Sequence, residues 1–311
     1  MSQDAQPVIA CTGLTKIYNN GVTALDNLTL AIQRGESFGL MGENGAGKST
    51  LVRLLMGFLF PTRGELTVLG ENEVRKAHRR IGYLHERPYV ELRFTGRRYL
   101  TYMAQLSGLW ENGCRERVAG VLEQVDLGLA ADEKIATYSK GMLQRLMIAQ
   151  TLLTEPELLI LDEPTNGLDP YSQWKMRQII AALRKQGKTI LLCSHYLAEV
   201  EMLCDTVGIL QRGHLAQYGA VADLVHTTEA VDILLVEGQD GDEIAQRLGL
   251  ANYIIETDGS LLRIHASAQQ VVLAALVEAS IPIHTLHPVS STLEEVYIKS
   301  TRPGVEAGMG V

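Results

Sequence analysis

The sequence predicts an α/β fold, in which a parallel sheet is flanked by helices, with a smaller α+β domain towards the C-terminal end. Two observations predict the sheet: a glycine-rich segment at 42–50 separates an apolar run from a helical pattern, and from residue 158 apolar runs alternate with helical segments. Strands that alternate with helices form parallel sheets, because each helix carries the chain back to the same edge. A third observation, the order strand–helix–strand–strand–helix–strand within residues 231–286, predicts the second domain.

Composition and charge narrow the class of protein. The chain has 311 residues, 46% of them hydrophobic, which is enough for one large and one small domain with buried cores. The formal net charge of −8 argues against a nucleic-acid-binding surface. No apolar run approaches the roughly 18 residues of a membrane span, and the N-terminus lacks the basic and apolar regions of a secretory signal. Four scattered cysteines predict reduced thiols in a cytoplasmic protein: Cys11, Cys114, Cys193 and Cys204.

The N-terminal part of the chain contains short strand signals on both sides of the glycine-rich segment. Apolar alternations within residues 8–32, interrupted at 19–21 by Asn-Asn-Gly, predict two antiparallel strands joined by a turn. A turn at 61–64 leads into a predicted strand at 65–69, and residues 81–84 predict a strand that stops abruptly. These signals indicate an antiparallel β subdomain beside the parallel sheet.

Residues 87–138 differ in character and predict a helical insert without strands. Apolar residues recur there at helical spacing, and Thr95 is placed to cap the first helix. After the insert, residues 158–161 and 189–193 predict two buried strands, separated by a helix over 170–185. This order extends the parallel sheet.

The C-terminal segment repeats none of these patterns. The predicted strands are 231–236, 253–256, 261–264 and 281–286, and the predicted helices are 243–248 and 269–278. Their order is that of a ferredoxin-like α+β domain. We therefore expect a first domain over residues 1–225, an accessory domain over 228–300, and a disordered tail at 301–311.

The segment 42–50 matches the complete phosphate-binding pattern G-x-x-x-x-G-K-[ST], in the strand–loop–helix context that this pattern requires. Glycines let successive N–H groups point at phosphate oxygens, and the following helix adds its positive N-terminal end. We expect Lys48 to reach the β- and γ-phosphates of a nucleotide and the Ser49 hydroxyl to ligate Mg²⁺. The predicted nucleotide-binding residues of this loop are Gly42, Asn44, Gly45, Ala46, Gly47, Lys48, Ser49 and Thr50. The larger domain is thus predicted to be a P-loop NTPase.

Two carboxylates follow the buried strand predicted at 158–161. Asp162, at the carboxyl end of this strand, suits a direct or water-mediated contact with Mg²⁺. Glu163 lies one residue further, where it is placed to polarise an attacking water. The alternative is a strand that happens to end in two acidic residues, and the phosphate-binding loop in the same chain favours the functional interpretation.

The segment 138–145, Tyr-Ser-Lys-Gly-Met-Leu-Gln-Arg, resembles the L-S-G-G-Q signature of the ATP-binding-cassette (ABC) ATPases. Ser139 and Gly141 are kept, whereas Lys140 replaces a glycine and Met142 replaces the glutamine. A serine there caps the following helix and faces a phosphate together with the loop amides. The resemblance implies that Ser139 and Gly141 contact ATP held by an opposite protomer.

Further segments follow in the order of this family over about residues 8–225. Residues 166–169 resemble the loop that crosses between protomers, although Asp169 is also placed to cap the next helix. His195, at a strand end, resembles the histidine that contacts the γ-phosphate. Tyr18 lies where the family has an aromatic residue that stacks on adenine, although tyrosine in a strand also serves packing.

One position departs from the family. Glu86 follows the strand at 81–84, where the family has a glutamine that senses the bound nucleotide. A carboxylate still approaches Mg²⁺, so Glu86 joins Ser49 and Asp162 as a predicted metal ligand, but it repels a γ-phosphate more than an amide does. Similar glutamates and signatures occur in exporters of the daunorubicin-resistance type, and residues 291–297 look like the closing motif of that group.

The resemblance implies the ATPase subunit of an ABC exporter, at the cytoplasmic face of the membrane. It implies ATP and Mg²⁺ as cofactors, a second ABC ATPase protomer in a homodimer, a separate transmembrane permease, and no nucleic acid. Lys48, Glu163 and His195 are the predicted catalytic residues. In this reaction Lys48 spreads the transition-state charge, Glu163 acts as base or orients the water, and His195 holds the γ-phosphate.

Three alternatives remain open on the sequence alone. A soluble ABC ATPase that clamps DNA or ribosomes is disfavoured by the single cassette, the lack of a long heptad run and the acidic balance. The sequence distinguishes an importer subunit from an exporter subunit less clearly. A pseudo-ATPase is disfavoured because Lys48, Glu163 and His195 are all present.

A basic cluster opens the predicted insert. It consists of Arg93, Arg97 and Arg98. One interpretation is a solvated basic face. The other is a contact surface for anionic groups, because the resemblance places this edge against the permease and the membrane leaflet.

Overall fold

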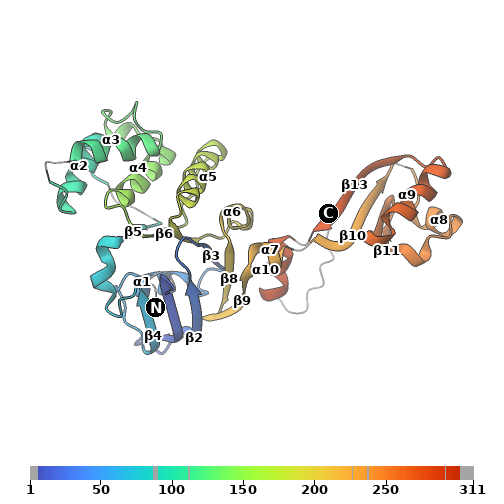
Figure 1. The fold of residues 1–311 in the computed structure, drawn as a ribbon, viewed down its shortest axis with the longest axis horizontal. Coiled ribbons are helices and arrows are strands. Elements are labelled where there is room, and N and C mark those ends of the chain that lie inside the picture. Colours follow the sequence, from blue (N-terminus) through green and yellow to red (C-terminus); the bar gives the residue numbers. More distant parts are fainter. Residues whose placement is uncertain are drawn as a thin grey trace. The chain divides into compact units, whose positions relative to one another are not determined.

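The computed structural model describes residues 6–86, 90–110, 113–225, 227–236, 238–290 and 292–301 (Figure 1). Contacts between residues divide the chain into two compact units, Met1–Val221 and Ala222–Val311. No helix within the described ranges is both long enough and apolar enough to cross a membrane. The predicted tail lies outside the described residues, apart from Thr301 at the end of the last helix.

A three-stranded antiparallel sheet forms the first part of the larger unit. It contains β1 (Ile9–Ile17), β2 (Thr23–Ile32) and β4 (Arg63–Val68), in the order β2-β1-β4. The predicted hairpin is confirmed, and its turn is closed by the Tyr18 N–H, which donates to Val22 O at 2.9 Å. The third strand starts two residues before its predicted position and ends at Val68, because Leu69 turns the chain with φ 53°.

A six-stranded sheet forms the centre of the larger unit, in the order β5-β6-β7-β3-β8-β9. Its strands are β3 (Ser37–Gly42), β5 (Ile81–Leu84), β6 (Leu158–Asp162), β7 (Thr189–Cys193), β8 (Thr206–Gln211) and β9 (His214–Ala220). The first five strands in this order are parallel, as predicted, and only β9 runs antiparallel, at the edge. Every residue of β3, β6 and β7 is buried, as expected for strands covered on both faces.

Helices cover the larger unit and account for the predicted insert. They are α1 (Lys48–Leu55), α2 (Gly96–Leu106), α3 (Cys114–Gln124), α4 (Lys140–Leu152), α5 (Pro170–Lys185) and α6 (Leu197–Leu203), with a 3-10 helix η2 (Val74–Arg80). The short helix α7 (Val221–Leu224) spans the division between the two units in the sequence. The insert contributes α2 and α3, which lie beside α4 at one end of this unit (Figure 1). The Thr95 side chain accepts a hydrogen bond from the Arg98 N–H and so caps α2 as predicted.

The core of this unit lies between its two sheets. Side chains of α1 such as Leu51 and Leu54 are fully buried there, together with Leu14 of the antiparallel sheet and Ile160 of β6. The four cysteines are free and buried, which agrees with the prediction of reduced thiols. Burial raises the pKa of the Cys11 and Cys204 thiols to about 12.

The smaller unit is an antiparallel sheet with helices. Its elements are β10 (Thr227–Leu235), α8 (Gly241–Arg247), β11 (Ile254–Asp258), β12 (Leu261–His265), α9 (Gln269–Glu278), β13 (Ile283–Ser290) and α10 (Leu293–Thr301). The strand order β11-β12-β10-β13 is that of a ferredoxin-like sheet and confirms the predicted fold class. Alternate residues of β12 are buried, because one face of the sheet packs on Val272 and Leu276 of α9.

Candidate functional site

The phosphate-binding loop connects β3 to α1, as the sequence predicts. Two glycines in it are required by the backbone. Gly47 has φ 116° and directly precedes α1, and a Cβ atom there would lie 2.5 Å from the Ala24 carbonyl oxygen. Gly42 has φ 151°, and a Cβ atom there would collide with the Leu210 carbonyl oxygen. The loop therefore fits between neighbouring backbone segments only without these side chains.

The side chains of the loop fold back over its own backbone. The Lys48 amine donates to the carbonyl oxygen of Gly42 at 2.5 Å and to that of Glu43 at 3.3 Å. Ser49 is exposed, and Thr50 is buried. Since the amine is held at the loop by weak carbonyl acceptors, a phosphate oxygen would compete for it with a full charge.

Tyr18 lies just after β1 and is attached to the loop. Its hydroxyl is 3.1 Å from Thr50 Oγ1, and the Lys16 amine lies 5.8 Å from the centre of its ring. The ring lines an open cavity of about 420 Å³ together with Asn19, Asn20 and Leu59, among others. This placement suits a residue that stacks on a planar ring next to bound phosphates.

Asp162 ends β6 at the carboxyl edge of the central sheet. It is only 9% exposed, and burial raises the pKa of its carboxyl to about 6. The like charges of Glu163 and Glu86 act in the same direction, while Lys48 opposes them. Asp162 is thus within electrostatic reach of both the phosphate-binding loop and the residue that follows β5.

Glu163 and His195 form a direct pair across the ends of β6 and β7. His195 Nδ1 lies 2.7 Å from Glu163 Oε2, and the glutamate side chain is 12% exposed while the histidine is 48% exposed. Glu163 has φ 50°, a left-handed conformation, and its N–H donates to the Cys193 carbonyl oxygen at 2.9 Å. This turn of the backbone aims the carboxylate at His195, with the imidazole on the more open side.

The predicted metal ligands were Ser49, Glu86 and Asp162. In the described part of the chain no group of three or more His, Cys, Asp or Glu side chains could hold a metal by itself. Mg²⁺ at nucleotide sites needs only one or two carboxylates, since phosphates and waters complete its shell. Asp162, buried next to two like charges, fits this demand because a cation would relieve the repulsion.

The signature segment starts α4 and touches the segment that starts α5. Ser139 caps α4 by accepting from the Met142 N–H at 3.2 Å, and the Lys140 amine donates to the Asn166 carbonyl oxygen at 2.9 Å. A Cβ atom at Gly141 would collide with the Ser172 side chain. Asp169 caps α5 through the Ser172 N–H at 3.0 Å, which confirms the capping interpretation of its local sequence. Ser139, Gly141 and Asp169 therefore belong to one contiguous patch.

Three residues that the sequence analysis missed connect the ends of β6 and β7. Glu199 of α6 is buried, and its Oε2 accepts from Ser194 Oγ at 2.8 Å and from Thr165 Oγ1 at 3.2 Å. A charged residue between the buried apolar residues of α6 was the signal in the sequence.

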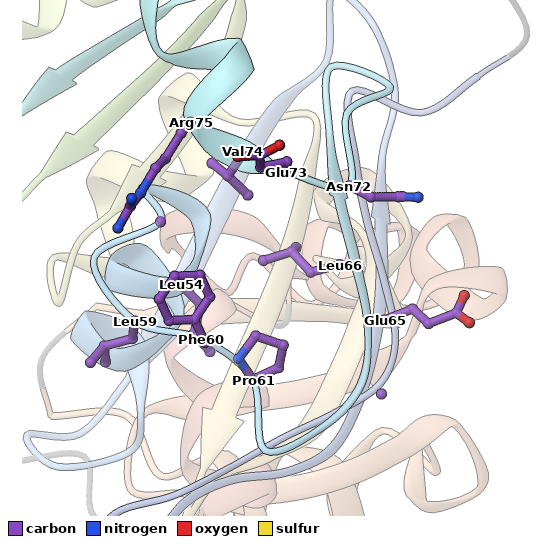
Figure 2. Close-up of a pocket in the computed structure, with 12 residues that line it drawn as sticks. Leu54, Leu59, Phe60, Pro61, Glu65, Leu66, Asn72, Glu73, Val74 and Arg75 are labelled. Atoms are coloured by element: carbon purple, nitrogen blue, oxygen red, sulfur yellow. The ribbon is translucent and has the colours of Figure 1, made fainter.

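The basic cluster and a cavity near α1 contain none of the predicted site residues. Arg97 of the basic cluster makes a two-pronged ion pair with Asp132 at 2.9 and 3.0 Å, so its guanidinium is engaged within the chain. Arg98 lies 5.3 Å from the centre of the Phe94 ring. A cavity of about 560 Å³ between α1, β4 and η2 is lined by none of the predicted site residues (Figure 2).

Comparison with protein families and known sequences agrees with this geometry. The family model for ABC transporters matches residues 25–166. An uncharacterized ABC transporter ATP-binding protein of Nostoc sp. is 39% identical over 267 residues, which cover 83% of this chain and 79% of that protein. The Nod factor export ATP-binding protein I of Ralstonia nicotianae is 32% identical over 303 residues, which cover 95% and 94%.

Solved structures give the same result. The cbiO1 protein of Clostridium perfringens, part of the ABC transporter complex cbiONQ, is similar with a TM-score of 0.66 and 28% identity, over 70% of this chain and 90% of that one. The ATP-binding cassette MJ0796, a dimer in a post-hydrolysis state bound to ADP and Pi, is similar with a TM-score of 0.62 and 25% identity, over 69% and 99%.

Proposed function

The chain belongs to the ATP-binding subunits of ABC transporters, and we propose that it hydrolyses ATP to drive export through a separate membrane permease. The observation that carries the proposal is the 2.7 Å pair of Glu163 and His195, which lies beside the buried Asp162 at the edge that continues from the phosphate-binding loop. A base, its orienting partner and a phosphate cradle are the parts that in-line hydrolysis of a nucleotide requires.

The phosphates of ATP would bind to the amides of the loop 42–50, with Lys48 on the β- and γ-phosphates. The adenine would lie on the Tyr18 ring, in the open cavity beside it. Ser49, with Asp162 and Glu86, would hold Mg²⁺, which supplies positive charge to the phosphate oxygens. The exposed position of Ser49 at the start of α1 suits this role.

Glu163 would take a proton from the attacking water or orient it. His195 would donate from Nδ1 to Glu163 and face the γ-phosphate with Nε2. One ring nitrogen of His195 is thus engaged by Glu163, which leaves the other for a phosphate oxygen. The pair would place both side chains at the site of reaction.

We propose that the active form is a homodimer. The signature residues Ser139 and Gly141 would contact ATP on the opposite protomer, since they share a patch with the segment 166–169 that resembles the crossing loop. The dimeric form of the similar cassette MJ0796 supports this arrangement. Residues 228–300 would be an accessory domain of each protomer.

The direction of transport is proposed from the relatives. Several curated relatives are Nod factor export ATP-binding proteins, which favours export over import. The subunit would bind the permease at the cytoplasmic face of the membrane. An importer subunit is the alternative that the sequence leaves open.

Purification of the tagged chain from detergent-solubilised membranes tests the proposal. We expect a multispan membrane protein to co-purify and to change the rate of ATP hydrolysis, and inside-out vesicles to accumulate the transported compound on addition of ATP. Glu163→Gln should retain the permease but abolish accumulation, with exposed Glu201→Gln as the matched control. Accumulation in right-side-out vesicles loaded with ATP would favour the importer, and no retained membrane protein would overturn the proposal.

A further inference from the structure

Glu199 is a buried carboxyl group in a helix that the roles above do not use. It lies in α6, is 1% exposed, and its Oε2 accepts from two hydroxyl groups, those of Ser194 and Thr165. Its other oxygen, Oε1, is buried and has no hydrogen-bond partner among the described residues. A carboxyl group in such surroundings costs free energy, and burial raises the pKa of Glu199 while the two hydroxyl groups lower it. Packing alone would be served better by an apolar side chain.

The first hydroxyl belongs to the segment that carries His195. Ser194 Oγ donates to Glu199 at 2.8 Å and accepts from the Tyr196 N–H at 3.1 Å. Ser194 and Tyr196, which make these two hydrogen bonds, are the sequence neighbours of His195. The bonds therefore fix the backbone from which the imidazole projects. Ser194 itself is fully buried, which leaves its hydroxyl few other partners.

The second hydroxyl belongs to the segment that carries Glu163. Thr165 is buried, lies two residues after Glu163, and donates to Glu199 at 3.2 Å. The turn between them is closed by the Asn166 N–H, which donates to the Glu163 carbonyl oxygen at 3.2 Å. Glu199 therefore contacts both segments whose side chains meet in the Glu163–His195 pair.

We propose that Glu199 is a positioning residue for hydrolysis: one carboxylate oxygen holds the segments after β6 and β7 at the separation that lets His195 Nδ1 reach Glu163 Oε2. This inference rests on the proposed ATPase function. A single acceptor shared by two donors fixes their separation, whereas two separate acceptors would let the segments move independently. The 2.7 Å contact between His195 Nδ1 and Glu163 Oε2 is then supported by the two hydrogen bonds that Glu199 accepts.

The inference distinguishes Glu199 from the residues that bind nucleotide. In the described part of the chain, the hydrogen bonds of the Glu199 carboxylate join it to Ser194 and Thr165 and not to the phosphate-binding loop. Loss of its acceptor should therefore lower kcat and leave KM for ATP nearly unchanged. Misplacement of catalytic groups by about 1 Å from a distance reduces rates by up to about 100-fold, so we expect a decrease of about 10- to 100-fold.

The first experiment compares three variants of the full chain in ATPase assays. Glu199→Met removes the acceptor at similar length and should show the full decrease in kcat. Glu199→Gln keeps an amide oxygen for both hydroxyls and should recover kcat to within about threefold of the wild type. Glu201→Met, on the exposed side of the same helix, is the control and should match the wild type. Unchanged kcat in folded Glu199→Met would overturn the inference.

Milder variants cover the case in which Glu199→Met does not fold. Ser194→Ala and Thr165→Val each remove one donor, and each should lower kcat with KM for ATP retained. Unchanged kcat in both would overturn the inference. In a His195→Ala background, loss of the Glu199 acceptor should have no further effect, because the pair that it positions is already broken. An equal proportional decrease in both backgrounds would instead show a general structural role and would also overturn it.

A spectroscopic measurement separates this inference from the proposed function. The imidazole NMR signals of His195, assigned by their loss in His195→Ala, should shift in Glu199→Met and stay in place in Glu201→Met. If the wild-type chain hydrolysed no ATP, the proposed function would fail, and the shift of these signals would still support or refute the positioning of His195 by Glu199.

Discussion

The carboxylates at the two ends of strand β6 have pKa values that are shifted in opposite directions. Glu157, just before the strand, is surrounded by arginines that lower the pKa of its carboxyl to about 2. Asp162, at the other end, is buried among like charges, and its pKa is raised to about 6. Four consecutive buried residues, from Leu158 to Leu161, separate the two environments. The comparison shows that one strand serves stability at its amino end and holds charge available for an external cation at its carboxyl end.

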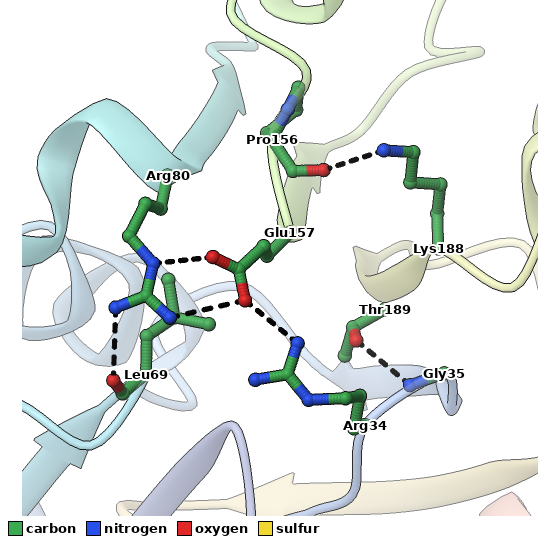
Figure 3. A network of polar contacts seen from close by, with 8 residues as sticks. All are labelled: Arg34, Gly35, Leu69, Arg80, Pro156, Glu157, Lys188 and Thr189. Carbon is green, nitrogen blue, oxygen red and sulfur yellow. Dashed lines mark hydrogen bonds and ion pairs between the residues drawn. The ribbon is translucent and has the colours of Figure 1, made fainter. Parts of the chain in front are cut away.

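The amino end is a closed network of charges (Figure 3). Arg80 Nε and Nη2 donate to Glu157 at 2.5 and 3.1 Å, and Arg34 Nη1 donates to Glu157 Oε2 at 2.7 Å. Arg80 Nη1 also donates to the Leu69 carbonyl oxygen at 3.3 Å. Since Arg34 precedes β3 and Arg80 ends η2, the network joins three segments that are distant in the sequence.

At the carboxyl end the compensation is weaker, because Lys48 opposes the like charges there but acts on Asp162 less strongly than they do. The charges that Asp162 senses most strongly are those of Glu163 and Glu86, both of the same sign as its own. His195 pairs with Glu163 rather than with Asp162. An arrangement of this kind is destabilising in isolation, and it is characteristic of a site that awaits a positively charged ligand.

The largest expected effect is that of Glu163→Gln, which would remove the base from the carboxyl end. Turnover should fall by about 100-fold or more, the usual value of a positioned acid–base group, while ATP binding is kept. The closed, ATP-loaded dimer should accumulate, and size-exclusion chromatography with ATP would detect it. Normal turnover in this variant would contradict the assignment of Glu163.

Asp162→Asn should stabilise the metal-free protein while abolishing its response to Mg²⁺. Because the folded-state pKa of Asp162 is raised from 3.8 to about 6, the folded state retains the proton more firmly, and wild-type stability falls as the pH rises from about 4 to about 6. The asparagine variant lacks this loss and should be more stable at neutral pH by about 3 kcal/mol. Urea unfolding in EDTA at about pH 7 and pH 4 measures the difference. A variant that is less stable at neutral pH would contradict the electrostatic account.

Glu157→Gln should have the opposite sign. The folded-state pKa of Glu157 is lowered from 4.5 to about 2, so its contribution to stability is fully present above about pH 4.5 and is lost as the pH falls towards 2. Since the side chain is 35% exposed, solvent screening reduces the expected loss to about 1–2 kcal/mol at neutral pH. Glu155→Gln, which breaks a more exposed pair with Arg117, is the matched control and should cost less. Equal losses in both variants would remove the contrast between the two ends.

Glu86→Gln should have the smallest effect on the isolated subunit. The amide removes one of the like charges that raise the pKa of Asp162, so the acid limb of the pH–rate profile should move to lower pH. Basal turnover should stay within about threefold of the wild type, and the ratio of turnover with and without permease should change. Complete loss of basal turnover would show that Glu86 is a catalytic carboxylate.

The sequence predicted the elements that are specified locally. The bounds of α5 and β7 agree with the predictions over 170–185 and 189–193, because Asp169 and Pro170 mark the helix start and an unbroken apolar run marks the strand. The phosphate-binding loop was found because its glycines and lysine are consecutive. The ferredoxin-like order was found because each strand and helix has its own period.

The sequence did not predict what depends on contacts between distant segments. The hydrogen bond of Lys140 to Asn166 joins residues 26 positions apart, and those of Glu199 reach back 34 positions to Thr165. In the sequence Lys140 is only a departure from a motif, whereas in the structure its amine donates to the Asn166 carbonyl oxygen of the neighbouring loop. The opposite pKa shifts of Glu157 and Asp162 likewise follow from which side chains the fold brings near, and no local pattern distinguishes the two carboxylates.

The four buried thiols provide probes of local opening at four places in the chain. Cys11 lies in the antiparallel sheet, Cys114 starts α3, Cys193 ends β7 and Cys204 follows α6. A thiol-specific reagent can modify each of them only when its own element opens, so the rate of modification measures local opening in four places of the same unit. Modification of Cys193 is the most informative of these rates. Its carbonyl oxygen accepts from the Glu163 N–H, so its alkylation reports the opening of the sheet edge that carries Glu163 and His195.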